Sequence, residues 1–352
     1  MESSAINIIQ DKKFVVSKSK KRYHDFFNNK YNNINLLSIK SLEGGFGLEA
    51  LVNHNGVYCD YQLNTVQDID SHFTSLHSIL DNTGFLLVSF ESQAKRRSKL
   101  IANTPLRLGI LHYYTFDFLI HRVIARLNAT QSTYLKLTKG KNQVLSVPEV
   151  LGRLIAAGFD IVDYTTVNEG SFVLATKGTI PTINRQKSHG PLIKLNRIGF
   201  RGQSIRVFKL RTMRPYSEHL QQYLQDKHGT IDGDKIISDF RITGWGKVLR
   251  KYWLDELPML INLIRGDVKL IGVRPLSHAK FYSYPKELQE TRIKVKPGLL
   301  PPYYADMPKN SKEFFDSEAR YTEAYLKAPF KTDMKYFLKI VSNIMLKGAR
   351  SK

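Results

Sequence analysis

The chain has 352 residues, of which 42% are hydrophobic, so it is long enough for two domains that each bury a core. Its single cysteine, Cys59, excludes an internal disulfide and fits a reducing compartment. A formal net charge of +22 indicates an anionic partner: nucleic acid, acidic lipid headgroups or phosphorylated substrates.

Neither a signal peptide nor a membrane span is expected. Residues 1–35 are polar, rich in Lys and Asn, and lack an apolar core. The most apolar long stretch, residues 106–127, is interrupted by Arg, His and Asp, and it falls short of the roughly 18 uncharged residues that a span needs.

Residues 34–178 alternate predicted strands and helices. Strands are expected at 36–39, 85–90, 159–164 and 171–176, and helices at 48–53, 68–80 and 147–157. This order, with a Gly-rich turn at 43–47 and a terminal hairpin, resembles class I S-adenosylmethionine methyltransferases. The resemblance implies a Rossmann-like α/β domain over residues 1–178. The turn has only Gly44, Gly45 and Gly47, and no ribose-binding acid stands out, which favours a degenerate accessory domain over active methyl transfer.

An amphipathic helix is predicted inside this domain. Its apolar stripe comprises Phe116, Leu119, Ile120, Val123, Ile124 and Leu127, with Arg122 and Arg126 off the stripe. Such a helix can lie in a membrane interface or pack on the core of its own domain, and the sequence leaves both open.

Polar residues 179–189 predict a linker. Beyond it, residues 205–213 predict a strand whose alternation places Lys209 and Arg211 on one face and Phe208 and Leu210 on the other. Two adjacent cations are typical of a site that binds polyphosphate.

A second helical stripe precedes Gly266, which is expected to stop the helix. We expect this stripe to be buried; it comprises Leu257, Leu260, Ile261 and Ile264.

Two adjacent carboxylates open that helix. Since Pro258 must lie in the first turn, Asp255 and Glu256 are expected at the N-terminus, where unpaired N–H groups and the helix dipole favour anions. Such a pair can supply a nucleophile and a ligand for a hard cation. Ordinary helix-start chemistry is the alternative, because Asp and Glu are common in any first turn.

Short motifs run through residues 190–298: Gly190-Pro191, Arg197-Ile-Gly199, Lys209-Leu-Arg-Thr-Met213, Asp239-Phe-Arg-Ile-Thr243, Leu249-Arg250, Leu254-Asp-Glu-Leu-Pro258, Gly266-Asp267, Arg274-Pro275 and Lys296-Pro-Gly298. Their order resembles that of bacterial sugar transferases, the monotopic polyprenyl-phosphate phosphoglycosyltransferases that start capsule, exopolysaccharide and O-antigen synthesis. The resemblance covers about the C-terminal half and implies a compact α+β domain over residues 190–352, with amphipathic helices.

The resemblance also implies a reaction and a place for it. Asp255 would attack the β-phosphate of a UDP-sugar and release UMP, Glu256 would hold Mg²⁺, and polyprenyl phosphate would then accept the phosphosugar. The location would be the cytoplasmic face of the bacterial inner membrane. The implied substrate-binding residues are Lys209, Arg211, Arg241, Arg250, Arg274, Pro275 and Lys296.

The chain departs from the family pattern in three respects, the first of which is Val273, which precedes Arg274 where the family usually has Pro. The hydrophobic re-entrant helix that precedes Gly190-Pro191 in the family is absent, which leaves the mode of membrane attachment open. Lys296-Pro-Gly298 is followed by Leu299-Leu-Pro-Pro302 instead of the usual Thr-Gly.

Two predictions concern the remaining surface of this half. A C-terminal helical stripe with lysines around it fits either a headgroup-level helix at an anionic membrane or packing on the core; it comprises Met334, Phe337, Leu338, Val341 and Met345. Trp245, between Gly244 and Gly246, is expected to fill a tight turn in the core.

Two functions from other classes remain as alternatives. A catalytically silent, membrane-associated assembly protein would keep the fold without the reaction. A nucleic-acid-binding protein would show steeply salt-dependent affinity, but no nucleic-acid module is recognisable, so we expect no nucleic-acid partner. A homo-oligomer is left open.

Overall fold

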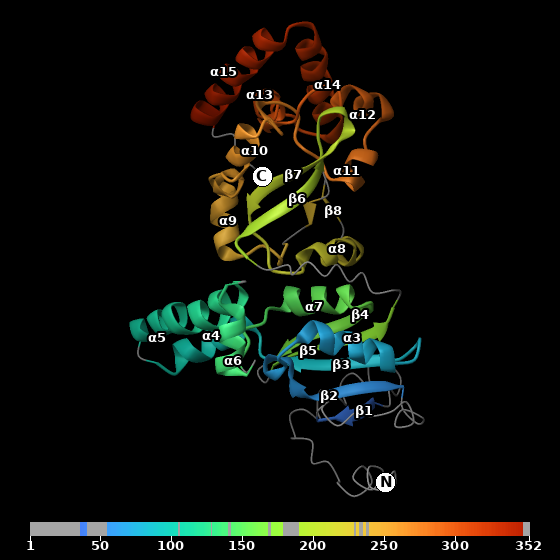
Figure 1. Cartoon of the computed structure of the whole chain (residues 1–352), viewed down its shortest axis with the longest axis vertical. Helices are drawn as coiled ribbons and strands as arrows, with labels where there is room; N and C mark the ends of the chain where they lie inside the picture. Colours follow the sequence, from blue (N-terminus) through green and yellow to red (C-terminus); the bar gives the residue numbers. More distant parts are fainter. Residues whose placement is uncertain are drawn as a thin grey trace, which may run out of the picture. The chain divides into compact units, whose positions relative to one another are not determined.

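The computed structural model describes residues 36–40, 55–104, 106–127, 129–139, 142–167, 170–178, 190–228, 230–231, 235–236 and 239–347. The chain divides into two compact units (Figure 1). Unit 1 comprises Met1–Ser188 and Pro215–Leu220, and unit 2 comprises His189–Arg214 and Gln221–Lys352. The chain therefore leaves unit 1, returns to it for six residues and leaves it again.

Unit 1 is built on a five-stranded mixed sheet with the order β1-β2-β3-β5-β4. The strands are β1 (Leu36–Ile39), β2 (Gly56–Gln62), β3 (Phe85–Phe90), β4 (Phe159–Val167) and β5 (Gly170–Lys177). β1, β2 and β3 are parallel, whereas β5 runs antiparallel to both β3 and β4. This confirms the predicted strands, the terminal hairpin and a mixed α/β class.

Local sequence explains the helices that connect these strands. Helix α3 (Ile69–Ile79) begins after Asp68, whose carboxylate accepts from the backbone N–H groups of Asp70 and Ser71. Helix α7 (Val147–Ala156) has Pro148 in its first turn and buries most of its length. Both helices were predicted within one residue at each end. The predicted Gly-rich turn at 43–47 and helix at 48–53 lie outside the described residues, and the methyltransferase likeness stays a prediction.

Between β3 and α7 the chain forms a helical insertion over residues 92–142. It contains α4 (Gln93–Ala102), α5 (Leu106–His112), the π-helix η3 (Tyr113–Val123), the 3-10 turn η4 (Ile124–Arg126) and α6 (Gln131–Thr138). Figure 1 shows α4, α5 and α6 grouped together at one end of unit 1. The short 3-10 turns η2 (Leu63–Thr65) and η6 (Ser217–Leu220) complete unit 1.

Unit 2 begins with a hairpin of β6 (Leu192–Ile198) and β7 (Ser204–Leu210), which η5 (Phe200–Gly202) closes. The segment that carries the two candidate carboxylates follows as α9 (Gly244–Lys251), η7 (Leu254–Glu256) and α10 (Met259–Ile264). Strands β10 (Lys269–Ile271) and β11 (Gly298–Leu300) then pair in parallel. The small elements between β7 and α9 are α8 (Gln221–His228), β8 (Thr230–Ile231) and β9 (Lys235–Ile236).

Five helices complete unit 2: α11 (His278–Tyr282), α12 (Lys286–Arg292), α13 (Tyr303–Asp306), α14 (Ser311–Lys327) and α15 (Pro329–Lys347). The core under α14 and α15 is rich in tyrosine and includes Tyr304, Tyr321 and Tyr336 with Val295 and Ile340. These residues tie the two long helices to β10 and β11.

Helix α15 buries polar and apolar side chains together and leaves its predicted stripe largely outside. Ile340 is fully buried, while Met334, Leu338 and Met345 are exposed. The stripe therefore does not pack as a unit on the core, which favours the surface interpretation of the two that the sequence left open. In the part of the chain that the structure describes, no helix has the length and apolar character to cross a membrane.

Candidate active site

The two candidate carboxylates lie in η7, in the tight turn between α9 and α10. Trp253, which precedes the turn, has a left-handed backbone (φ 56°), and its Nε1 donates to the hydroxyl of Tyr304 at 3.1 Å. This contact fixes the start of η7 against the core of unit 2. Asp255 is buried, with 9% of its surface exposed, and Glu256 is half-buried.

The environment of Asp255 has opposing effects on its carboxyl. Burial raises the pKa of Asp255, the positive charge of Lys209 lowers it, and the neighbouring charge of Glu256 raises it again. The net direction is upward. A carboxylate that is partly desolvated, yet lies in the field of cations, is a competent nucleophile toward an anionic electrophile.

Strand β7 brings Lys209 to this turn. The Nζ of Lys209 donates to Oε1 of Glu256 at 2.5 Å, and both side chains are largely shielded from solvent. Burial lowers the pKa of Lys209, and the charge of Glu256 opposes that shift. The pair joins two segments that lie 47 residues apart in the sequence.

Asn262 holds α10 against β7. Its side chain accepts from the Phe208 N–H at 3.0 Å and donates to the Arg206 carbonyl at 2.7 Å. It also donates to Oδ2 of Asp267 at 2.9 Å, and it is completely buried. The Phe208 N–H and the Arg206 carbonyl precede Lys209 by one and three residues on β7. Asn262 therefore sets the position of this strand relative to the carboxylates.

The helical stripe predicted to be buried in α10 is instead exposed, and that prediction is wrong. Ile264 is 87% exposed, and the inward side of the short helix is formed by Met259 and Asn262. The reason is that α10 docks on β7 through the polar Asn262, which turns its apolar stripe outward. The exposed side chains are Leu257, Leu260, Ile261 and Ile264.

Trp245 also differs from its prediction, since its side chain is 69% exposed rather than packed in the core. Thr243 caps α9, since its hydroxyl oxygen accepts from the Gly246 N–H. Gly246, rather than Trp245, packs against the core. A Cβ added at Gly246 would lie 2.0 Å from the Thr212 carbonyl oxygen. The first turn of α9 therefore packs through glycine and turns its indole outward.

Arg250 and Arg274 approach the carboxylates from two other segments. Nε of Arg250 donates to the Thr212 hydroxyl at 3.0 Å, and the guanidinium lies in the electrostatic field of Asp255. Arg274 interacts electrostatically with Glu256 and lies near the phenol of Tyr303. Lys209, Arg250 and Arg274 thus all interact electrostatically with the carboxylate pair, and their role in binding substrate stays a prediction.

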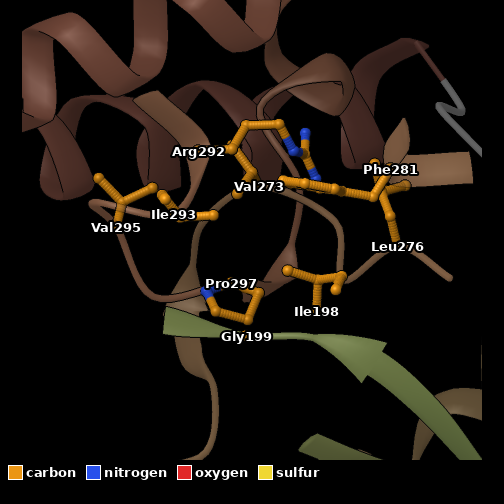
Figure 2. A pocket seen from close by; sticks show the side chains of 9 residues that line it. All are labelled: Ile198, Gly199, Val273, Leu276, Phe281, Arg292, Ile293, Val295 and Pro297. Carbon is orange, nitrogen blue, oxygen red and sulfur yellow. The ribbon is translucent and has the colours of Figure 1, made fainter. Parts of the chain in front are cut away.

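A buried ion pair supports the backbone at Arg274. Arg292 pairs with Glu318, which is fully buried, and its second terminal nitrogen donates to the Arg274 carbonyl at 2.6 Å. Arg292 also lies among apolar side chains in a small pocket near the end of β6 (Figure 2). The nine residues that line this pocket include no carboxylate, so it is separate from the candidate nucleophile.

The remaining predicted residues have other partners. Nε of Arg211 donates to the Gly190 carbonyl at 2.8 Å, and Nζ of Lys296 donates to the Gly266 carbonyl at 3.0 Å, at the end of α10. The buried Arg241 forms two hydrogen bonds with the Asp239 carboxylate, at 2.8 and 2.7 Å. These contacts support loops beside the site. Pro275 is buried next to Arg274.

Several residues of the site were not predicted from the sequence. Arg197 lies in the field of Arg274, Tyr303 lies in that of Arg274 and Glu256, and Thr212 orients Arg250. Among these residues, only Asn262 had a sequence signal for a contact, because it is a polar residue on the side of the helix opposite the apolar stripe. Arg197 and Thr212 stand in two of the motifs quoted from the sequence, but their contacts join distant segments and have no local pattern.

A family model described as "Bacterial sugar transferase" matches residues 157–347, which is more than half of the chain. The chain belongs to the bacterial sugar transferase family. The match includes the whole of η7 and begins inside unit 1, before β4.

Curated relatives in this family are similar over about a third of the chain. The galactosyl transferase CpsE of Streptococcus agalactiae is 37% identical over 117 residues, which cover 32% of this chain and 26% of that protein. The UDP-N-acetylgalactosamine-undecaprenyl-phosphate N-acetylgalactosaminephosphotransferase of Aeromonas hydrophila is 31% identical over 150 residues, covering 39% of this chain and 33% of that protein. The UDP-glucose:undecaprenyl-phosphate glucose-1-phosphate transferase of Caulobacter vibrioides is 35% identical over 120 residues, covering 32% and 40%. The chain therefore spans between about a quarter and two-fifths of the length of these relatives.

Proposed function

We propose that this chain transfers a sugar 1-phosphate from a UDP-sugar to polyprenyl phosphate, as the first membrane step of surface polysaccharide synthesis. The observation that carries the proposal is the buried Asp255 beside Glu256, in the field of Lys209 and Arg250. The relatives whose names specify undecaprenyl-phosphate sugar phosphotransferases support the same reaction class.

The first half-reaction forms a covalent intermediate on Asp255. A carboxylate oxygen attacks the β-phosphorus of the UDP-sugar, and the bond from that phosphorus to the oxygen that bridges the two phosphates breaks. UMP leaves with the bridging oxygen and its electron pair, and the phosphosugar remains on the carboxylate. Arg250 and Arg274 offset the negative charge that gathers on the phosphate oxygens.

The second half-reaction returns Asp255 to its starting state. A phosphate oxygen of polyprenyl phosphate attacks the same phosphorus, and the bond between the phosphorus and Asp255 breaks. The product is a polyprenyl diphosphate-linked sugar, and the carboxylate is free for another cycle. Lys209, which pairs with Glu256, supplies a positive charge beside the carboxylate that carries the phosphosugar.

The donor set fits Mg²⁺ that is held mainly by substrate. Among the described residues, no group of three or more His, Cys, Asp or Glu side chains is placed to hold a metal ion. Mg²⁺ commonly uses one or two carboxylates together with substrate phosphates and water, so Glu256 would be sufficient as the ligand from the protein. When bound, the ion would neutralise charge on the diphosphate.

An exposed apolar surface beside η7 supports action at a membrane, which we propose is the cytoplasmic face of the bacterial inner membrane. A lipid acceptor must reach Asp255 from a bilayer, and exposed apolar side chains lie beside the turn: Trp245 on α9, Leu257 at the end of η7, and Ile261 and Ile264 on α10. Trp at such a position suits the headgroup level.

The test is UMP release from a panel of UDP-sugars, with Mg²⁺ and with or without polyprenyl phosphate. The wild type is compared with Asp255→Asn, which keeps the shape of the side chain and removes its nucleophilic charge. We expect lipid-dependent UMP release by the wild type and a loss of at least about a thousandfold in the variant, because the covalent step needs the carboxylate.

The matched control is Asp316→Asn, which makes the same chemical change on an exposed position of α14. It should retain wild-type activity. Equal UMP release by wild type and Asp255→Asn would refute the nucleophile, and no release from any UDP-sugar would favour the silent assembly protein.

A further inference from the structure

The helical insertion of unit 1 places polar contacts inside and apolar side chains outside. Its three helical segments are joined by polar pairs: Gln93 with the Tyr113 hydroxyl at 2.8 Å, Arg96 with Asp117 at 2.5 Å, and His121 with Tyr134 at 2.8 Å. A water-exposed helical cluster ordinarily shows the opposite arrangement.

The apolar side chains of α5 and η3 face outward. Gly109, Tyr113 and Asp117 recur every four residues and form the buried edge; a Cβ at Gly109 would lie 3.1 Å from the Leu100 carbonyl oxygen of α4. The predicted stripe is therefore exposed at Phe116, Leu119 and Ile120, whereas its remaining residues, Val123, Ile124 and Leu127, are half-buried. The exposed apolar side chains of the insertion are Leu108, Ile110, Leu111, Tyr114, Phe116, Leu119, Ile120 and Leu137.

This concentration is specific to the insertion. Among the described residues of unit 1, every large apolar side chain that is exposed lies between Leu108 and Leu137. Leu108 is 61% and Phe116 59% exposed. Monomeric proteins rarely expose contiguous apolar surface of this kind unless something covers it.

The charge of the insertion identifies what covers it. Residues 93–141 contain ten Lys and Arg residues and one acidic residue, Asp117. Asp117 is buried and paired with Arg96, so it offers no negative charge at the surface. Arg97, which is exposed, stacks over the rings of Tyr113 and Tyr114 at the border of the apolar surface. Apolar side chains bordered by cations and tyrosine match the boundary between acyl chains and anionic headgroups.

We propose that the insertion docks unit 1 on an anionic phospholipid surface. Its exposed Leu, Ile and Phe side chains enter the headgroup boundary, and its Lys and Arg side chains bind lipid phosphates. This attachment is separate from the apolar surface beside η7 and does not depend on the proposed transfer reaction. It gives the chain a membrane contact in a region outside the matched family segment.

The test uses the full chain and sedimentation with vesicles of phosphatidylcholine, either pure or containing phosphatidylglycerol. Phe116→Asp combined with Leu119→Asp should lower partition onto the anionic vesicles by about tenfold or more. The reason is that two side chains proposed to enter the headgroup boundary become charged. Thr74→Asp combined with Ser78→Asp is the charge-matched control on exposed positions of α3, and should bind almost as the wild type does.

A second variant tests the role of charge. Arg97→Gln combined with Lys99→Gln should weaken binding to anionic vesicles and leave binding to pure phosphatidylcholine unchanged. Circular dichroism and thermal melting verify that each variant is folded.

Three results would overturn the proposal: unchanged binding by the Phe116/Leu119 variant, equal partition onto both vesicle types, or lipid-free self-association that this variant abolishes. The last result would identify a second copy as the occupant. Vesicle binding is measured without substrate, so a failure of UMP release in every protein would remove the transfer reaction and leave this proposal standing.

Discussion

At the scale of single residues, the chemistry depends on how the charge of Asp255 is balanced. Burial raises the pKa of Asp255 and the charge of Lys209 lowers it. The proposed nucleophile must be ionised to react, so the rate should fall on the acid side at a higher pH than for an ordinary carboxylate. Lys209→Met removes the lowering influence and should move this acid limb to still higher pH. The measurement is the pH profile of UMP release in a single turnover.

Two further variants make that profile specific. Lys209→Arg keeps the positive charge and should leave the limb near its wild-type position. Glu256→Gln removes a charge that raises the pKa of Asp255, so its residual activity should show the limb at lower pH. A limb that stays fixed in all three variants would mean that another group controls the rate.

The raised pKa of Asp255 also affects the stability of the fold: the ionised form that the proposed reaction needs is the less stable one in the folded protein. A carboxyl whose pKa is higher in the folded state favours folding below its unfolded pKa, and this contribution is lost as pH rises through the folded pKa. At neutral pH, ionised Asp255 therefore opposes folding. The loss of activity in Asp255→Asn should accordingly come with no decrease in melting temperature, which separates a catalytic effect from unfolding.

Sequence alone predicted the candidate carboxylate pair but not the residues that position it. Asp255 and Glu256 are adjacent and lie within a motif, so their proximity needs no knowledge of the fold. Tyr303 and Arg197 reach Arg274 from segments that only the folded chain brings together. No local periodicity encodes such contacts.

At the scale of elements, α10 is attached to the hairpin by a polar side chain. Asn262→Ala would remove the partner of the part-buried Phe208 N–H and Arg206 carbonyl, at a cost of about 1 kcal/mol for each hydrogen bond. Because β7 carries Lys209, we expect the free energy of unfolding to fall and UMP release to fall with it. Chemical denaturation and the transfer assay measure the two effects.

Leu260→Ala is the control on the outer face of the same helix. It removes three carbon atoms from a side chain that is 44% exposed, so the free energy of unfolding should change by less than in Asn262→Ala, by about 0.5 kcal/mol. If Leu260→Ala were the more destabilising change, the orientation of α10 described above would be incorrect.

This element also shows why periodicity misled the prediction. Apolar residues at i, i+3, i+4 and i+7 identify a helix with one apolar face, and they do not say whether that face meets a core or an outer surface. The burial of α7 and the exposure of the α10 stripe arise from equally regular patterns. Strands β3 and β5 were easier to predict, because near-continuous apolar runs have no exposed alternative.

At the scale of the whole molecule, unit 1 contains a segment that comes from within the transferase sequence. Arg153 donates to Asp70 at 2.5 Å and lies 4.3 Å from the ring centre of Tyr216, whose hydroxyl also bonds to Asp70. Gly152 leaves room for this segment: an added Cβ would lie 2.2 Å from the Tyr216 carbonyl oxygen. Local composition gives no sign of this return of the chain.

Gly152→Ala should therefore displace residues 215–220. We expect a loss of about 1–3 kcal/mol in the free energy of unfolding, since a backbone oxygen cannot yield as a side chain can. Limited proteolysis should detect new cleavage between residues 215 and 220. Gly244→Ala is the control, because a Cβ there meets nothing within 4 Å, and it should be neutral or slightly stabilising. Protection of 215–220 in Gly152→Ala would contradict the packing.

The return of Pro215–Leu220 to unit 1 also orders events on the ribosome. A chain emerges from its N-terminus, and a domain generally folds as a unit once its sequence is available. Unit 1 lacks the partner of Arg153 and Gly152 until Tyr216 has emerged, by which point the hairpin of β6 and β7 is already outside. The last packing step of unit 1 therefore follows the synthesis of β7, the strand that carries Lys209. The ribosome begins to make unit 2 before unit 1 is complete.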